Sequence, residues 1–277
     1  MDETKIALFE GKQIRKVIYQ NEWWFSIIDV VEILTKSSIP KRYWSDLKIR
    51  LIEEGYREAY EKIVRLKMKA PDGKMRETDC ANTETMLRIV QSIPSPKAEP
   101  FKRWLAKVGY ERIQEIEDPE LAAQRARSTY RAKGYPESWI EKRMRGIEVR
   151  ETLTNEWKNR GAKENIEYAI LTNEILQGAF DMTAEDYKNF KGLKRENLRD
   201  HMDDIELILT MLGEATTTRL HQDRNSKGFE PLRHDAKDGG SVAGRTRKDI
   251  EQKSGKPVAT KKNFKSLSAR KRLMDNK

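Results

Sequence analysis

The feature that most constrains this chain is a change of residue periodicity along its length. Short apolar and β-branched runs fill residues 6–26, and alternation returns from Ile63 to Lys69. From Lys97 to about Leu212, apolar residues recur only at helical spacing. The sequence therefore predicts an α+β fold: a small N-terminal module, a mostly α-helical body and a flexible basic C-terminal tail.

Composition favours amphipathic helices over a sheet buried on both faces. Charged residues make up 36% of the chain, well above the average of roughly 25%. No apolar run approaches the roughly 18 residues of a membrane span, and the first residues lack a signal-peptide pattern. Cys80 is the single cysteine, which fits a reducing compartment. We expect a soluble, cytoplasmic protein with no membrane partner.

The positive charge is concentrated near the C-terminus. The formal net charge is +10, and from Ala236 onward we count about 13 Lys and Arg against about 4 acids. Such a segment should attract polyanions in a salt-dependent way. A solubilising role is the alternative. The candidate phosphate contacts in this tail are Lys261, Lys262, Arg270, Lys271 and Arg272.

Two helices are predicted in the N-terminal module. Ser26 is a suitable N-cap for the first, and the second should begin at Pro40 and end at Gly55. The outer face of the second helix carries candidate DNA contacts, although a solvated polar face would look the same: Lys41, Arg42, Lys48 and Arg50. Trp23, Trp24 and Trp44 are expected to be core residues rather than base-stacking platforms.

A basic β-hairpin follows. Alternation from Ile63 to Lys69 places Arg65, Lys67 and Lys69 on one face, about 7 Å apart, comparable to successive phosphates. Pro71-Asp72-Gly73 predicts the turn. Lys74 and Arg76 should add positive charge from the return strand, which runs from Met75 to Cys80. The alternative is a solvated face of an ordinary hairpin.

The helical spacing predicts where the domains end. Asn82 should cap a helix that ends at Pro94-Ser95-Pro96, and apolar periodicity is lost after Gly213. The expected domains are therefore 1–96, a DNA-binding module; 97–213, a helical domain; and 214–277, a glycine-containing basic tail that is partly disordered. Interleaved acids and bases in the helical domain favour support or self-association, so a homodimer is possible.

Signatures of enzymes are weak. His201 and Asp204 could share one helix face, but two ligands do not make a metal site. Pro71-Asp72 lacks the Glu-x-Lys that would complete a nuclease motif. The run from Gly239 to Arg245 could cradle a phosphate, but without a preceding strand it favours a flexible turn. Cys80 is expected to be a small buried residue. We predict no catalytic residue, metal or cofactor.

Several motifs resemble known families. Three stretches look like parts of a Bro-N domain, which is found in prophage antirepressors and baculovirus repeated-ORF proteins. They are Phe9-Glu10-Gly11-Lys12-Gln13-Ile14-Arg15, then Trp24-Phe25-Ser26-Ile27-Ile28-Asp29-Val30, and Asp72-Gly73-Lys74 to Asp79-Cys80-Ala81. Three further stretches are similar to the bacterial DNA-damage-inducible protein D family: Ile93-Pro94-Ser95-Pro96-Lys97, Leu198-Arg199-Asp200-His201-Met202 and Gly239-Gly240-Ser241-Val242-Ala243-Gly244. That resemblance extends to about Phe264.

The resemblance implies a bacterial or prophage protein linked to the DNA-damage (SOS) response, with no established catalytic residue to carry over. Together with the basic faces, it predicts a non-catalytic DNA-binding regulator or accessory factor. Arg65 and Arg76 are the expected base readers, because arginine can bond guanine bidentately. Two alternatives stay open: an antirepressor-like module that binds a repressor or recombinase, and a metal-dependent nuclease.

Overall fold

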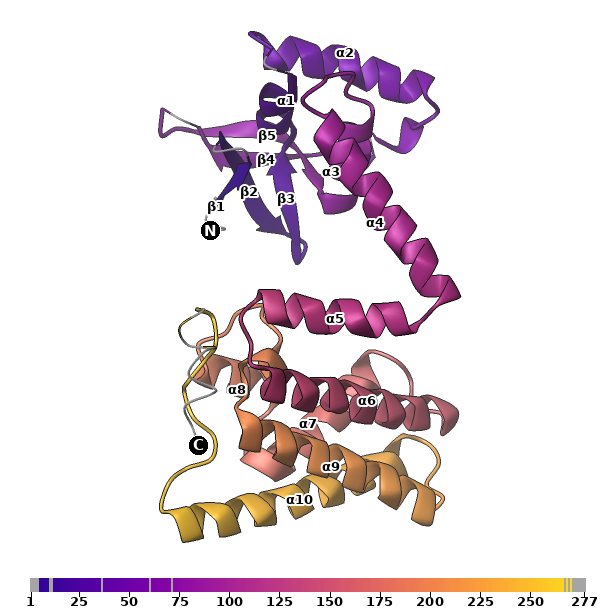
Figure 1. Cartoon of the computed structure of the whole chain (residues 1–277), viewed down its shortest axis with the longest axis vertical. Helices are drawn as coiled ribbons and strands as arrows, with labels where there is room; N and C mark the ends of the chain where they lie inside the picture. Colours follow the sequence, from indigo (N-terminus) through magenta and orange to yellow (C-terminus); the bar gives the residue numbers. More distant parts are fainter. Residues whose placement is uncertain are drawn as a thin grey trace. The chain divides into compact units, whose positions relative to one another are not determined.

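The computed structural model describes residues 5–9, 12–35, 37–59, 61–70, 72–266, 268 and 270. It divides into two compact units, Met1–Asp118 and Pro119–Lys277 (Figure 1). The fold is α+β, as predicted, with strands in the first unit and helices in both. The Pro94-Ser95-Pro96 break separates two helices of the first unit, so the first compact unit extends beyond the expected boundary at residue 96.

The N-terminal unit is built on an antiparallel sheet. Its described strands are β1 (Lys5–Phe9), β2 (Lys12–Tyr19), β3 (Glu22–Ser26), β4 (Val64–Lys69) and β5 (Met75–Asn82), in the spatial order β1-β2-β3-β5-β4. The first three strands form the predicted meander, and Gln20 and Asn21, both at positive φ, make the tight turn between β2 and β3. The basic hairpin joins this sheet because β5 pairs with β3.

Helices of the N-terminal unit begin and end where the sequence predicts. In α1 (Ile27–Thr35), the Ser26 hydroxyl accepts from the Asp29 N–H. In α2 (Pro40–Glu53), Pro40 opens the first turn and Gly55, at φ +87°, follows the C-terminus. In α3 (Thr83–Gln91), the Asn82 side chain accepts from the Thr85 N–H at 3.0 Å.

The core of this unit lies among α1, α2, α3 and the sheet. Ile27, Leu47, Leu51 and Ile89 are fully or almost fully buried in it. Trp44 is also buried there, and Trp24 is buried in a second cluster with Cys80. The prediction of core roles is confirmed for these two tryptophans, whereas Trp23 is only half-buried, with Lys16 over its ring. The unit ends with α4 (Glu99–Glu117).

The second unit is helical throughout its regular structure. Its described helices are α5 (Glu120–Ala132), α6 (Glu137–Asn159), α7 (Ile166–Phe180), α8 (Ala184–Phe190), the 3₁₀ turn η2 (Leu198–His201), α9 (Asp204–Asp223) and α10 (Phe229–Ser254). Breaks at 118–119, 134–136, 161 and 181–183 separate successive helices. The Thr183 hydroxyl and Asp186 carboxylate form a capping box at the start of α8.

The expectation of a partly disordered tail from residue 214 is wrong for residues 214–254. Helix α9 continues to Asp223, and α10 packs against α7 and α9. Its glycines allow this packing: a Cβ on Gly240 would lie 2.5 Å from the Ile175 carbonyl oxygen of α7, and one on Gly239 would lie 2.1 Å from Thr217 Oγ1 of α9. The glycine run is therefore neither a phosphate cradle nor a flexible turn, but a close helix contact.

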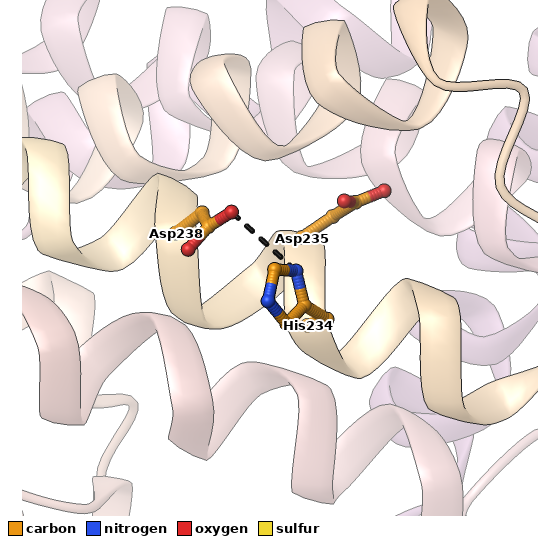
Figure 2. Close-up of side chains that lie close together, drawn as sticks. All are labelled: His234, Asp235 and Asp238. Atoms are coloured by element: carbon orange, nitrogen blue, oxygen red, sulfur yellow. Dashed lines mark ion pairs between the residues drawn. The ribbon is translucent and has the colours of Figure 1, made fainter.

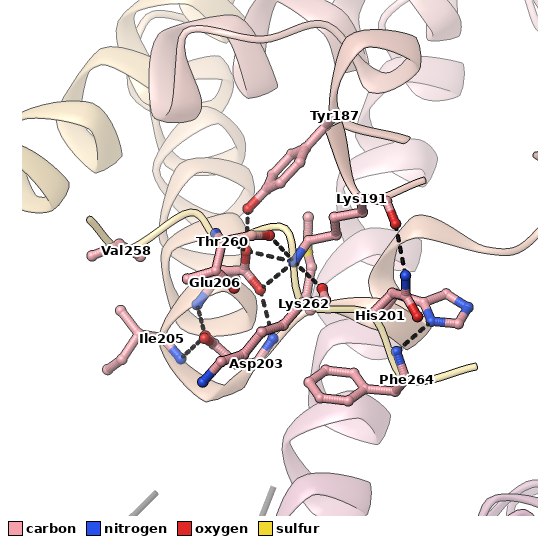
Figure 3. A network of polar contacts seen from close by, with 12 residues as sticks. Tyr187, Lys191, His201, Asp203, Ile205, Glu206, Val258, Thr260, Lys262 and Phe264 are labelled. Atoms are coloured by element: carbon pink, nitrogen blue, oxygen red, sulfur yellow. Dashed lines mark hydrogen bonds and ion pairs between the residues drawn. The ribbon is translucent and has the colours of Figure 1, made fainter. Parts of the chain in front are cut away.

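The C-terminal segment after α10 is held by a buried polar network (Figure 3). Lys191 and Glu206 form an ion pair at 2.8 Å with both side chains fully buried. The Lys191 ammonium also donates to the carbonyl oxygens of Thr260 and Lys262, at 3.0 and 3.1 Å. Glu206 accepts from the Tyr187 hydroxyl at 2.6 Å. A charged pair at this depth requires such additional partners, and here the partners fix residues 260–262.

His221 lies in a second buried polar chain. The Trp157 indole N–H donates to His221 Nε2 at 3.0 Å, so that nitrogen is unprotonated, and Nδ1 donates to Asp235 at 2.9 Å. Burial lowers the pKa of His221, while the hydrogen bond and charge of Asp235 oppose the shift. This geometry stabilises the neutral imidazole.

No helix of the described residues is long and apolar enough to cross a bilayer.

Candidate nucleic-acid interface

The basic hairpin has the alternation that the sequence predicts. Arg65, Lys67 and Lys69 of β4 are exposed, while Met68 between them is fully buried. Gly73, at φ +81°, supports the turn, and its N–H donates to the Ala70 carbonyl at 2.8 Å. The period of two in β4 therefore puts three basic side chains on one outward face of the ladder.

The return strand places acidic residues beside this row. Arg65 pairs with Asp79 and Lys67 pairs with Glu77 in the register, whereas Lys69 pairs with Met75. Arg76 pairs with Met68, which puts it on the opposite face, and it forms an ion pair with Asp72 instead. The expectation that Arg76 extends the β4 row is therefore wrong: the register puts it on the other face.

Helix α2 and the hairpin together line a cleft of about 240 Å³, which we call the α2–hairpin cleft. It contains three of the predicted contact residues, one from the hairpin and two from α2: Arg65, Lys41 and Lys48. Lys41 and Lys48 reach the same side because residues seven apart lie nearly two helical turns along one face. The structure thus joins the two basic features that the sequence predicts separately.

Asp79 organises this cleft. Its Oδ2 accepts from the Trp44 indole N–H at 2.8 Å and from Lys48 Nζ at 3.4 Å, and its Oδ1 lies 3.4 Å from Arg65 Nε. Burial by itself would raise the pKa of Asp79, but the Trp44 hydrogen bond and the charges of Lys48 and Arg65 outweigh burial and lower it. Glu77 also lines the cleft, so the lining holds three cations and two carboxylates and keeps a net charge of +1.

The other predicted residues of this unit lie outside the cleft lining. Arg42 and Arg50 are exposed on α2, and Lys74 is exposed at the hairpin turn. Lys67 and Lys69 continue the Arg65 row away from the cleft.

The tail residues have different environments. Lys261 and Lys262 are exposed, and the Lys261 ammonium lies 5.9 Å from the Phe190 ring centre. The Arg270 guanidinium donates to the carbonyl oxygens of Phe264, Lys133 and Lys265. Lys271 and Arg272 lie outside the described residues.

Two residues considered as enzyme signals in the sequence, His201 and Cys80, have structural roles. His201 Nδ1 accepts from the Phe264 N–H at 3.0 Å, and burial lowers the pKa of His201. Cys80 is fully buried, and burial raises the pKa of its thiol to about 12, which disfavours the nucleophilic thiolate. These two groups therefore support the packing of their units.

A carboxylate–histidine group in α10 has the composition of a metal site. Among the described residues, ligand atoms of His234, Asp235 and Asp238 lie within 4.8 Å of one another (Figure 2). However, one guanidinium nitrogen of Arg224 donates to Asp235 and Asp238 at 2.7 Å each and lies 3.5 Å from His234 Nδ1. The arginine already supplies the positive charge that a metal ion would bring, so this group is explained as an ion-pair network.

Two polar residues that line the cleft were not among the predicted contacts: Asp79 and Ser45. Asp79 follows Arg76 by three residues in a strand, which puts the two on opposite faces. The spacing separates the two residues, and the register with β4 decides that Asp79 is the one beside Arg65.

Comparisons with known proteins agree with the N-terminal part of this description. Residues 13–112 match the model of the BRO family, N-terminal domain, and this range falls inside the first compact unit. The Bro-N domain is associated with DNA-binding regulators and prophage antirepressors, and it is not known as an enzyme family. A comparison with curated proteins found no match. The resemblance to the DNA-damage-inducible protein D family stays a prediction.

Proposed function

We propose that this chain is a non-catalytic DNA-binding regulator whose N-terminal unit holds phosphates in the α2–hairpin cleft and along β4. The observation that carries the proposal is the convergence of Lys41, Lys48 and Arg65, from two separate elements, on one cleft. The Bro-N match supports a regulatory role. The finer role, in a bacterial or prophage DNA-damage response within the cytoplasm, rests on the sequence resemblance alone.

The electrostatics of the cleft support phosphate binding. Lysine ammonium groups act as point charges toward phosphates, whereas Arg65 can also read a guanine edge. Asp79 holds Lys48 and Arg65 in place before DNA arrives, which reduces the conformational entropy lost on binding. Lys67 and Lys69 extend the contact along the strand.

The test replaces three lysines with glutamine in the full-length chain: Lys41, Lys67 and Lys69. Arg65 and Lys48 stay, because removing either would disturb Asp79. Loss of three phosphate contacts should weaken duplex binding about 100-fold at about 0.15 M salt and lower the salt slope by about 2.7. Fluorescence anisotropy over a series of salt concentrations measures both quantities.

The matched control replaces Arg57, Lys97 and Lys102, which belong to the same unit and do not line the cleft. With glutamine at these three positions, the control removes the same charge but leaves the cleft and β4 unchanged. It should therefore lower the affinity for DNA much less. If the two triple variants weaken binding equally, only net charge matters and the proposed site is refuted.

A protein-interaction role is the second candidate, favoured by exposed apolar side chains on α4. Trp104, Tyr110, Ile113 and Ile116 are each more than half exposed. Apolar side chains gathered on one helix are typical of protein-binding surfaces. A pull-down with nuclease added discriminates the two functions: a repressor or recombinase retained after digestion favours this candidate, whereas loss of all partners favours DNA binding.

A further inference from the structure

Three adjoining clefts form one groove in the helical unit. Their volumes are about 480, 390 and 340 Å³. The first two share Thr172, Ala184 and Lys188, and the second and third share Glu196 and Asn197. Because neighbouring clefts have lining residues in common, we treat them as a single feature, the helical-unit groove.

The groove lining is strongly basic. It contains Glu185, Glu196 and Asp200 as its acids. Its basic residues come from the α5–α6 connection, α8, the loop that follows α8, η2 and the C-terminal segment: Lys133, Lys188, Lys194, Arg195, Arg199, Lys265 and Arg270. Sequence spacing alone does not reveal this group, since its members are separated by up to 137 residues along the chain.

Two of the acids are already compensated. Glu196 accepts from the backbone N–H groups of Lys194 and Arg195 and forms an ion pair with Lys265 at 3.1 Å. These backbone hydrogen bonds, that from Lys194 foremost, lower the pKa of Glu196 to about 2. Asp200 forms an ion pair with Arg143 at 2.9 Å. Neither carboxylate therefore offsets the remaining cations of the groove.

Several of the cations keep their charge available. Lys188 is half-buried, lines two of the clefts, and forms no ion pair with another described residue. Arg270 is bound by carbonyl oxygens, which carry no net charge. Arg199 shares the single carboxylate of Glu214 with Arg150, so that cluster has an excess of one positive charge.

The buried Lys191–Glu206 network places the C-terminal side of the groove. Lys191 fixes the carbonyls of Thr260 and Lys262, and its own carbonyl accepts from the Asn263 side chain at 2.9 Å (Figure 3). Lys265 then donates to the Gly192 carbonyl at 2.7 Å. A segment held by this many hydrogen bonds presents Lys265 in a defined position before any ligand binds.

We propose that the helical-unit groove binds the phosphodiester backbone of a single strand of nucleic acid. A row of small connected clefts suits a narrow strand, and cations along a groove are the usual means of holding one. The aromatic side chain in the lining, Tyr135, is buried and stacks on Trp139 at 4.1 Å, so it is not free to stack on a base. Recognition should therefore depend on phosphates and tolerate any sequence. This site goes beyond the proposed function, because it lies in the other unit.

The experiment weakens the first site before it probes the second. In a full-length chain with glutamine at positions 41, 67 and 69, Lys188→Gln and Lys194→Gln are added, and a fluorescent oligothymidylate is titrated. Loss of two contacts on a single strand should weaken binding about tenfold at about 0.15 M salt and lower the salt slope by about 1.4. A retained circular dichroism spectrum shows that the fold is intact.

Two control variants make the result decisive. Lys227→Gln with Lys248→Gln removes the same charge from exposed positions outside the groove. Lys188→Arg with Lys194→Arg keeps the charge and should retain binding. An equal loss in the Lys227 and Lys248 variant, or a larger loss for duplex than for single-stranded DNA, overturns the proposal. Because the same three lysines of the first site are replaced in every variant, the remaining contribution of Lys48 and Arg65 is the same throughout and cancels in the comparison.

Discussion

Replacing Gly240 with alanine should destabilise the helical unit. The added Cβ would lie 2.5 Å from the Ile175 carbonyl oxygen and 2.9 Å from the Ile175 Cα. Both atoms belong to the backbone of α7, so no side-chain rotation relieves the overlap. Ordinary van der Waals contact requires roughly 3.4 Å or more, which means that α7 and α10 must separate by about 1 Å.

The magnitude follows from two opposing terms. Overpacking a tight contact typically costs about 1–3 kcal/mol, and more where only backbone can move. Alanine regains about 1 kcal/mol of helix propensity relative to glycine. We expect a net loss of about 2 kcal/mol, which in a unit of this size lowers the melting temperature by about 4–8 °C. Thermal and urea unfolding followed by circular dichroism at 222 nm measures the change.

Gly146→Ala is the matched control in the same unit. Gly146 is also inside a helix, but an added Cβ would meet only the Met211 side chain, at 3.5 Å, which is ordinary contact. This variant should be unchanged or more stable by up to about 1 kcal/mol. If Gly240→Ala is as stable as Gly146→Ala, the close approach of α7 and α10 does not exist, and the interpretation of residues 214–277 as a flexible tail is restored.

Three further predictions concern charged groups. Because burial keeps the pKa of His221 below its ordinary value of 6.5, the unfolded chain takes up a proton first as the pH falls. The free energy of unfolding should therefore be fully retained above about pH 6.5 and should decrease below it. This decrease should be smaller in His221→Gln and the same as in the unaltered chain in a His234→Gln control, as measured by urea unfolding at each pH. Lys191→Met should cost about 3–5 kcal/mol by leaving the Glu206 carboxylate buried without its cation, and adding Glu206→Leu should restore much of this. Asp79→Asn should strengthen duplex binding about fivefold at about 0.15 M salt by anisotropy, because it removes a carboxylate that competes with phosphate; weaker binding would contradict that role.

Local signals in the sequence were enough to place most elements of the fold. Ser26, Asn82 and Thr183 each cap a helix through a hydrogen bond to a nearby backbone N–H, and Pro40 and Gly55 bound α2. These interactions span three residues or fewer, or follow from the allowed backbone angles of one residue. The ends of these helices can therefore be predicted without knowledge of the tertiary structure.

The glycine run of α10 shows where that kind of reasoning stops. Glycine has the same effect on local propensity whether it serves a flexible turn or a close helix contact. The difference lies in partners that are distant in the sequence. Gly178 comes 62 positions before Gly240, and the carbonyl oxygen of Gly178 would lie 2.1 Å from a Cβ on Gly244. Only the packing of α7 on α10 separates the two interpretations, and no local pattern encodes it.

The α2–hairpin cleft illustrates the same limit for a binding surface. Alternation predicts which side chains of β4 share a face, but the register with β5 decides that this face also carries Asp79. A row of lysines and arginines without a carboxylate would repel one another and adopt many conformations. Asp79 lowers the net charge and so weakens long-range attraction, yet it fixes Lys48 and Arg65 beside Trp44. The same carboxylate thus costs affinity and supplies geometry, which is why its removal should raise affinity while making binding less dependent on the position of the phosphates.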